Sequence, residues 1–255
     1  MGKFWLMGWR WLRFGAINAS IDLMNFQGKN ILVLGGIGSV GGSIADAFEG
    51  AGGRVAKHGF NSGDFPADLA DSSAVNRMVE KVLAEFGRVD ILVNAVSAPV
   101  KIGGLEKKSW ADFSRHLEVQ LKGLVEVASG VLPKMKEQKW GRIINILSSY
   151  TLGVPPSSLS DYVAAKYAML GLTKALAKEL GRFQITVNGI SPSFIKNNFT
   201  KEVPERLADL LVAETPLGRL AVPADVTGAV LFLASESAGF ITGVNLPVSG
   251  GSSMG

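Results

Sequence analysis

Residues 31–42 read ILVLGGIGSVGG and decide the fold of this chain. The first four form a continuous apolar run, which is typical of a strand buried on both faces of a parallel sheet. The glycines after it allow a sharp turn, and a helix is predicted from about Val40 to Ala51. Such a turn lets the backbone approach a pyrophosphate, which then meets the positive end of the helix. We therefore predict dinucleotide binding here; the alternative is a tight turn that holds no ligand.

Strand-like and helix-like segments alternate along the rest of the chain, which predicts an α/β fold. We expect a doubly wound, mainly parallel sheet in three layers, α/β/α. No linker, composition break or internal repeat divides the segments, so a single domain is expected over residues 24–255. Further strands are predicted at 54–58, 90–94, 142–147, 185–191 and 244–248, and further helices at 72–86 with Ser72 as N-cap, 109–123 continuing to 135, 162–180 and 223–234.

The composition is that of a globular protein with a large core, because 47% of residues are hydrophobic and 19% are charged. The absence of cysteine excludes disulfides and thiolate metal sites and is compatible with a cytoplasmic location, which we expect. Only two histidines are present, so no metal site is predicted. The net charge of +4 is spread along the chain, and its largest clusters, 106–108 and 134–139, are typical of solvated helix ends. Nucleic acid is therefore not an expected partner.

Residues 1–23 form an aromatic extension that is interrupted by Lys3, Arg10 and Arg13. Its apolar run is too short and too charged for a membrane-spanning helix or a signal peptide. Three interpretations stay open. The extension contacts a membrane surface as an amphipathic segment, it packs on a partner subunit, or it is not part of the native chain, since Met24 offers a start directly before the first strand.

A tyrosine and a lysine four residues apart, Tyr162 and Lys166, lie on one face of the helix predicted at 162–180. A phenol titrates near pH ~10 in water, and an ammonium one helical turn away stabilises its anion. Ser148, at the end of the preceding strand, can hold a substrate carbonyl against the phenol. These three residues predict a proton-transfer site for a carbonyl or an alcohol, although such a pair also occurs on ordinary surface helices.

The end of the second strand bears on the choice between NAD and NADP. An acidic residue there would bind the ribose 2′-hydroxyl of NAD and repel the 2′-phosphate of NADP. Residues 58–62 read HGFNS, and the first carboxylate after the strand is Asp64. Since Lys57 and His58 are also nearby, we expect NADP(H) to be favoured over NAD(H).

Together these motifs resemble those of the short-chain dehydrogenase/reductase family, over roughly residues 25–254, and most of all its 3-oxoacyl-acyl-carrier-protein reductases. Residues 35–41 resemble the family's glycine turn, and Ile241-Thr242-Gly243 with Gly250-Gly251 its C-terminal end. The resemblance implies a Rossmann-like fold and a nicotinamide cofactor. The cofactor-binding residues that it implies are Gly35, Ile37, Ser39, Val40, Gly41, Asp68, Leu69, Asn94, Ala95, Tyr162, Lys166, Pro192 and Ile195.

The resemblance also implies a catalytic set of Ser148, Tyr162, Lys166 and Gln120. Tyr162 would donate a proton to the substrate oxygen while the nicotinamide delivers hydride to the carbon. Lys166 would hold the nicotinamide ribose and lower the pKa of Tyr162, and Ser148 would polarise the carbonyl. Gln120 stands where the family has an asparagine that anchors a water of the proton relay.

Several residues depart from the family pattern. Leu34 replaces a threonine, Ser39 a glycine, Val96-Ser97 an alanine–glycine pair, and Gln120 the asparagine. The spacing from Ser148 to Tyr162 is one residue longer than usual, so Ser149 is the alternate catalytic serine. These departures raise the expectation of a specialised or weakened enzyme.

We therefore expect an NAD(P)H-dependent enzyme that reduces a carbonyl to an alcohol, with a 3-oxoacyl thioester of acyl carrier protein or coenzyme A as substrate, as in fatty acid biosynthesis. Two alternatives stay open: a dehydrogenase of a small secondary alcohol or sugar, and a catalytically weakened, cofactor-binding partner subunit. Substrate choice is expected to lie with residues 97–104, 151–160 and 196–215, the last as a lid. The apolar helix at 162–180 predicts a homotetramer or homodimer.

Overall fold

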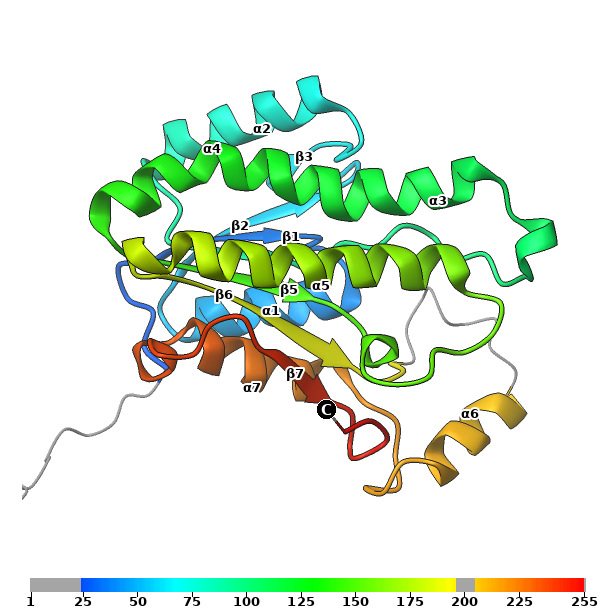
Figure 1. The fold of residues 1–255 in the computed structure, drawn as a ribbon. Coiled ribbons are helices and arrows are strands. Elements are labelled where there is room, and N and C mark those ends of the chain that lie inside the picture. The colour runs from blue at the N-terminus through cyan, green and yellow to red at the C-terminus, as the bar shows by residue number, and fades with distance from the viewer. Residues whose placement is uncertain (1–23, 196–204, 255) are drawn as a thin grey trace, which may run out of the picture.

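The structure is a computed structural model that describes residues 24–195 and 205–254. Its centre is a seven-stranded sheet in the order β3-β2-β1-β4-β5-β6-β7, in which all neighbouring strands run parallel (Figure 1). The strands are β1 (Asn30–Leu34), β2 (Arg54–Gly59), β3 (Phe65–Pro66), β4 (Ile91–Asn94), β5 (Gly141–Ile146), β6 (Ile185–Pro192) and β7 (Asn245–Val248).

Helices cover both faces of this sheet and produce the three predicted layers (Figure 1). On one face α2, α4 and α5 share a core with the sheet, and on the other face α1 and α7 share a second core with it. The predicted doubly wound α/β fold is confirmed. The helices are α1 (Ser39–Gly50), α2 (Ser72–Phe86), α3 (Trp110–Leu117), α4 (Gly123–Gln138), α5 (Ser160–Leu180), α6 (Glu205–Ala213) and α7 (Pro223–Ala234).

The apolar runs form the central strands because both faces of the sheet are covered. Every residue of β4, β5 and β6 is buried, as are Ile31–Leu34 of β1. Alternate residues of β1 enter different cores: Leu32 and Leu34 contact the side of α2 and α5, and Ile31 and Val33 the side of α1 and α7. A strand buried on both faces favours a continuous apolar run, which is the pattern that residues 31–34 show.

A π-helical turn, Glu118–Lys122, joins α3 to α4, where the sequence predicted a continuous helix. A π turn widens the helix by one residue and redirects the side chains in it. Its central residue, Gln120, is fully buried. The turn therefore points the side chain of Gln120 into the protein, next to the start of α5.

Two local predictions were wrong. Helix α2 is capped by Asp71, whose carboxylate accepts from the Ser73 and Ala74 backbone N–H groups at 2.8 and 3.2 Å, and Ser72 instead donates to Glu126. Strand β3 was missed because it has only two residues.

Two other expectations concern segments that the structure describes only in part or not at all. Of the predicted lid, residues 196–204 lie outside the described residues, and α6 forms most of the rest. The extension 1–23 also lies outside them. Within the described residues, no helix is both long and apolar enough to cross a membrane.

Candidate active site

The glycine turn between β1 and α1 brings the backbone very close to the neighbouring strands. Gly35 has φ +77°, and a Cβ atom there would lie 2.9 Å from the Ala95 carbonyl oxygen. The N-cap of α1 is Gly38, and no side chain caps the helix. The first N–H groups of α1, which include those of Ser39 and Val40, thus remain for an anion at the positive end of the helix. This cradle of bare backbone fits the pyrophosphate of a dinucleotide.

His58 of β2 supports the glycine turn through a hydrogen bond to its backbone. The Gly35 N–H donates to His58 Nδ1 at 3.2 Å, and His58 Nε2 lies 3.0 Å from the Ala67 carbonyl oxygen. Burial lowers the pKa of His58, so the ring is neutral and donates from Nε2 to Ala67. Lys57 binds Asp46 and Glu49 of α1 at 2.9 and 3.0 Å. Both basic side chains thus have protein partners in this structure, and the preference for NADP(H) stays a prediction.

Asp68 and Leu69, the residues predicted to contact the adenine of the cofactor, come directly after Ala67. Asp68 accepts from the Ala70 N–H at 3.0 Å and lies 3.3 Å from Arg115 of α3, while Leu69 is buried. The carboxylate is one-third exposed, so one side of it faces solvent.

Further predicted cofactor residues lie at the carboxyl ends of the strands beyond β1. Asn94 ends β4 and donates from Nδ2 to the Gln120 backbone carbonyl at 3.1 Å, while its Oδ1 is buried without a partner. Ala95 donates its N–H to Leu34 at 2.9 Å. Pro192 ends β6, and Ile195 follows it in an isolated bridge with Ala221.

The remaining predicted cofactor residues, Ile37 and Gly41, flank the start of α1. Ile37 is half exposed, whereas Gly41 is buried in the first turn of the helix. The sheet thus gathers the predicted cofactor residues along one edge, where open α/β sheets bind ligands.

Tyr162 and Lys166 face the same edge from the first turns of α5. The Lys166 ammonium donates to the Ile146 carbonyl at 2.8 Å and lies 5.6 Å from the centre of the Tyr162 ring. Burial raises the pKa of Tyr162 to about 12, although a hydrogen bond with the Ser148 side chain acts against this. Burial also lowers the pKa of Lys166 to about 7. Desolvation thus outweighs the effect of Ser148 on the pKa of Tyr162, and the expected lowering of that pKa by Lys166 stays a prediction.

Ser148 lies two residues after the end of β5 and caps a short helical turn, where its Oγ accepts from the Tyr150 N–H at 3.3 Å. The Ser148 side chain lies close enough to Tyr162 to act against the rise of its pKa, whereas Ser149, which is also buried, has no such effect. The geometry favours Ser148 over its alternate. The hydroxyls of Ser148 and Tyr162 can therefore bind one carbonyl oxygen together.

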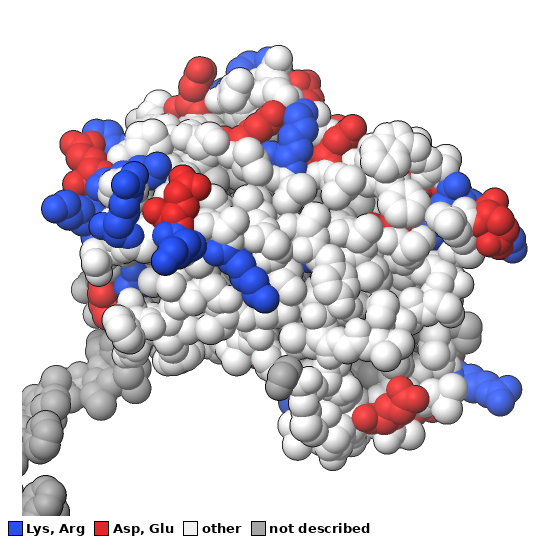
Figure 2. Space-filling view, viewed as in Figure 1, with Lys and Arg blue, Asp and Glu red and all other residues white. Residues whose placement is uncertain are grey.

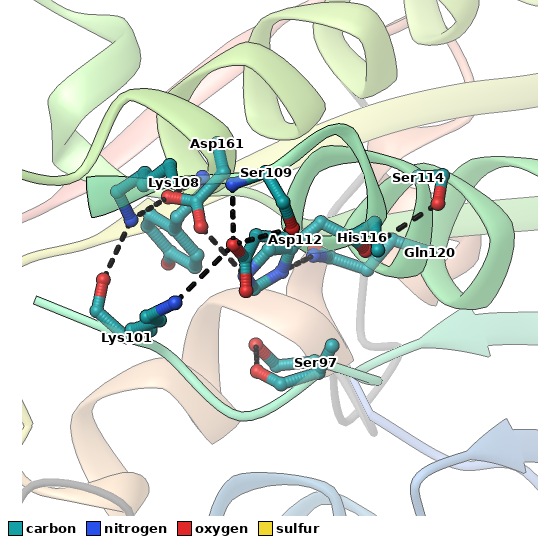
Figure 3. Close-up of polar contacts among 12 residues, drawn as sticks. Ser97, Lys101, Lys108, Ser109, Asp112, Ser114, His116, Gln120 and Asp161 are labelled. Carbon is teal, nitrogen blue, oxygen red and sulfur yellow. Dashed lines mark hydrogen bonds and ion pairs between the residues drawn. The ribbon is translucent and has the colours of Figure 1, made fainter. Parts of the chain in front are cut away.

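Gln120 is joined to residues that the sequence reasoning missed. Its Nε2 lies 3.1 Å from Nδ1 of His116, whose Nε2 lies 3.9 Å from Asp161. Asp161 in turn binds Lys108 at 2.6 Å, and both side chains are fully buried (Figure 3). The only signal in the sequence was Asp161 directly before Tyr162. Its partner Lys108 was interpreted as part of a solvated cluster, which was wrong.

The order of the elements is typical of one family of oxidoreductases. So are the hydroxyls of Ser148 and Tyr162, the Lys166 ammonium and the glycine turn before α1. A family model described as "Enoyl-(Acyl carrier protein) reductase" matches residues 36–253, which is most of the chain. The chain belongs to the short-chain dehydrogenase/reductase family. Among the residues described, no group of three or more His, Cys, Asp and Glu side chains could hold a metal ion.

Several members of the short-chain dehydrogenase/reductase family are similar over most of their length. The (2S)-[(R)-hydroxy(phenyl)methyl]succinyl-CoA dehydrogenase subunit BbsD of Thauera aromatica is 40% identical over 188 residues, 74% of this chain and 75% of that protein. The 3-oxoacyl-[acyl-carrier-protein] reductase FabG of Escherichia coli K12 is 32% identical over 91% of this chain and all of its own. A solved structure described as a short-chain alcohol dehydrogenase from Sinorhizobium meliloti 1021 has a TM-score of 0.85 at 26% identity, and the match covers 91% of this chain and 100% of that one.

Proposed function

We propose that this chain reduces the carbonyl of a 3-oxoacyl thioester to an alcohol with NADP(H) as cofactor. The observation that carries the proposal is the side chain of Tyr162, which lies next to that of Ser148 and one helical turn from Lys166. A proton donor and a second hydroxyl that lie side by side can both hydrogen-bond to one carbonyl oxygen. They stabilise the negative charge that develops on it during reduction.

The proposed roles follow from the contacts of each group. Ser148 donates a hydrogen bond that polarises the carbonyl, and Tyr162 gives its proton to the oxygen. The raised pKa of Tyr162 keeps the phenol protonated at neutral pH, which suits reduction, where the group must begin as an acid. Lys166, which binds the Ile146 carbonyl, supplies the nearest positive charge for the phenolate that remains. Gln120 orders the relay behind these groups.

The cofactor, when bound, supplies the hydride. We assign its pyrophosphate to the uncapped start of α1, at Gly35, Ile37, Ser39, Val40 and Gly41. The other proposed cofactor contacts are Asp68, Leu69, Asn94, Ala95, Tyr162, Lys166, Pro192 and Ile195. Preference for NADP(H) is supported by the end of β2, which closes on Gly59 without a carboxylate. Asp64, the first one after it, accepts from the Lys57 N–H at 3.0 Å.

The printed names of the relatives support a thioester substrate. One acts on an acyl-coenzyme A with a hydroxyl group, and others on 3-oxoacyl groups of acyl carrier protein. Two alternatives each have one observation in their favour. The Sinorhizobium structure is described as an alcohol dehydrogenase, and the Thauera relative is named as a subunit, which suits a catalytically weakened partner chain.

We further propose that residues 24–255 form one domain and that this domain forms a homotetramer or homodimer. Figure 2 shows charged side chains gathered at the left of the view and few over its middle, where an uncharged surface could meet a second copy. Tyr167 of α5 and Val125 of α4 are each 44% exposed. A cytoplasmic location, and the role of residues 1–23, stay predictions.

The test is oxidation of NADPH and of NADH by the purified protein with acetoacetyl-coenzyme A. A rate with NADPH that Tyr162→Phe abolishes, without loss of NADPH binding measured by fluorescence, is the expected result. An unchanged rate in Tyr162→Phe would overturn the mechanism. Binding of cofactor without turnover of this thioester or of small alcohols would favour the partner-subunit alternative.

A further inference from the structure

A buried ion pair joins the segment before α3 to the start of α5, the helix that carries Tyr162 and Lys166. The Lys108 ammonium lies 2.6 Å from Oδ1 of Asp161 and donates to the Lys101 carbonyl at 2.6 Å (Figure 3). The same Oδ1 accepts from the Tyr162 N–H at 2.9 Å. The two charged side chains are 0% and 1% exposed. Removing two charges from water is costly, so a buried ion pair adds little net stability. This pair therefore points to a role in positioning.

The second oxygen of Asp161 faces His116. Oδ2 has no hydrogen-bond partner and lies 3.9 Å from His116 Nε2. On the other side of the ring, Nδ1 lies 3.1 Å from Gln120 Nε2, which can only donate. Nδ1 must then be the acceptor, so a neutral His116 carries its proton on Nε2, directed at the carboxylate.

The charges around His116 favour this neutral form. The charged and titratable groups that face it are Asp161, Tyr162 and Lys166 of α5, Lys108 before α3, and Asp112 of α3 itself. Burial lowers the pKa of His116, as do the ammonium groups of Lys166 and Lys108 against the pull of Asp161. Lys108 therefore offsets part of the effect of the Asp161 carboxylate, which alone would raise the pKa of His116.

The His116 ring also lies edge-on to the reacting phenol, with its centre 5.9 Å from that of Tyr162. His116 thus contacts two of the proposed catalytic side chains, Tyr162 through its ring edge and Gln120 through Nδ1. A protonated ring could no longer accept at Nδ1, and the Gln120 amide would have to turn over or lose its partner.

We propose that Lys108, by pairing with Asp161, keeps His116 in its neutral, Nε2-protonated form, and that His116 in turn fixes the Gln120 amide and the Tyr162 ring for catalysis. The proposal rests on the proposed function for its kinetic consequence only. Lys108, Asp161 and His116 are positioning residues, since they act through Gln120 and Tyr162.

The tautomer can be measured without any substrate. We would record ¹⁵N imidazole spectra of the full chain from pH 5 to 8, with His116→Asn to assign the two histidines. His58 is an internal control, because its Nδ1 accepts from Gly35 and its form is fixed independently. Both rings are expected as neutral Nε2–H tautomers at pH 7. A charged or Nδ1-protonated His116 at that pH overturns the proposal.

Lys108→Met then tests the role of the ion pair. It removes the cation that pairs with the Asp161 carboxylate, so His116 should become protonated at a higher pH than in the wild type, while the titration of His58 does not change. In Lys108→Met/Asp161→Asn the attraction is gone and the wild-type form of His116 should return. An unchanged His116 signal in the folded single variant contradicts the proposal. If that variant does not fold, two results still decide it: the wild-type tautomer, and Asp161→Asn, in which His116 should become protonated only at a lower pH than in the wild type.

The kinetic arm compares two replacements of His116. Asparagine can place an acceptor oxygen where Nδ1 was, whereas leucine cannot. We expect His116→Leu to lower kcat at least 10-fold with little change in the KM for NADPH, and His116→Asn to retain most of the rate. Equal loss in both folded variants would show a structural role only and overturn the proposal. No turnover by the wild type would count against the proposed function, while the spectra would still test this inference.

Discussion

Replacing Gly41 by alanine should destroy cofactor binding, whereas the same change at the next residue should not. A Cβ at Gly41 would lie 2.7 Å from the Gly35 carbonyl carbon and closer still to its oxygen. Ordinary van der Waals contact begins at 3.4 Å, so the overlap is at least about 0.7 Å. Both sides of the contact are backbone, which cannot rotate away, and the turn itself must move.

Overpacking of this kind costs roughly 1–3 kcal/mol or more. If the whole cost falls on the cofactor-binding form of the turn, the Kd for NADPH rises about 5- to 150-fold, since about 1.4 kcal/mol is a factor of ten. Gly42→Ala is the matched control, because its Cβ would meet its nearest atom at 3.5 Å. That residue lies within α1, where alanine favours the helix by about 1 kcal/mol over glycine.

The assay is a fluorescence titration of NADPH, with thermal unfolding of the same samples. We expect weak binding in Gly41→Ala, and near-normal binding with an equal or higher Tm in Gly42→Ala. Normal NADPH affinity in a folded Gly41→Ala would refute the reasoning that this turn forms the pyrophosphate cradle. Equal loss in both variants would show that the helix, and not the close approach to Gly35, controls binding.

Three further predictions concern stability. Asp71→Ala should lower the free energy of unfolding by about 1 kcal/mol in a urea titration. Asp71→Asn keeps an acceptor for the cap of α2 and should lower it by much less. Equal effects of the two changes would show that the cap does not stabilise the protein. The Arg219 guanidinium lowers the pKa of Asp225 from 3.8 to about 2, so the stability lost in Asp225→Asn should be present above pH 4 and vanish as the pH falls through 2; a difference that persists there would contradict this. Because burial lowers the pKa of Lys166 to about 7 from 10.5, the unfolded chain binds more protons between these values. The free energy of unfolding should then rise with pH in that window for the wild type relative to Lys166→Met, and parallel curves would show that the lysine stays charged.

The sequence predicts the architecture well because each central strand is buried on both faces. An apolar run such as Ile31–Leu34 has one compatible place in a doubly wound sheet, and a glycine turn fixes where the helix begins. The cap of α2 was assigned one residue too late, since aspartate and serine are both good caps and stand side by side at Asp71 and Ser72. Strand β3 has no periodicity to detect in two residues.

The site was predictable only where one element carries it. Tyr162 and Lys166 are four residues apart on α5, so helical spacing alone brings them together. Lys108 and Asp161 are 53 residues apart, and nothing local to either residue indicates that both are buried. The contacts of His58 could not be predicted for the same reason: its partners, Gly35 and Ala67, come from other segments. Pairing across the fold decides whether a charged side chain is solvated or structural.

The strand order has a consequence for how the chain is made. From β1, the sheet grows in one direction through β2 and β3 and in the other through β4, β5, β6 and β7. Each new strand pairs with one that has already been synthesised, so no strand needs a later one to define its place in the sheet. The glycine turn and its support at His58 can therefore be complete before the segment with Tyr162 has been translated.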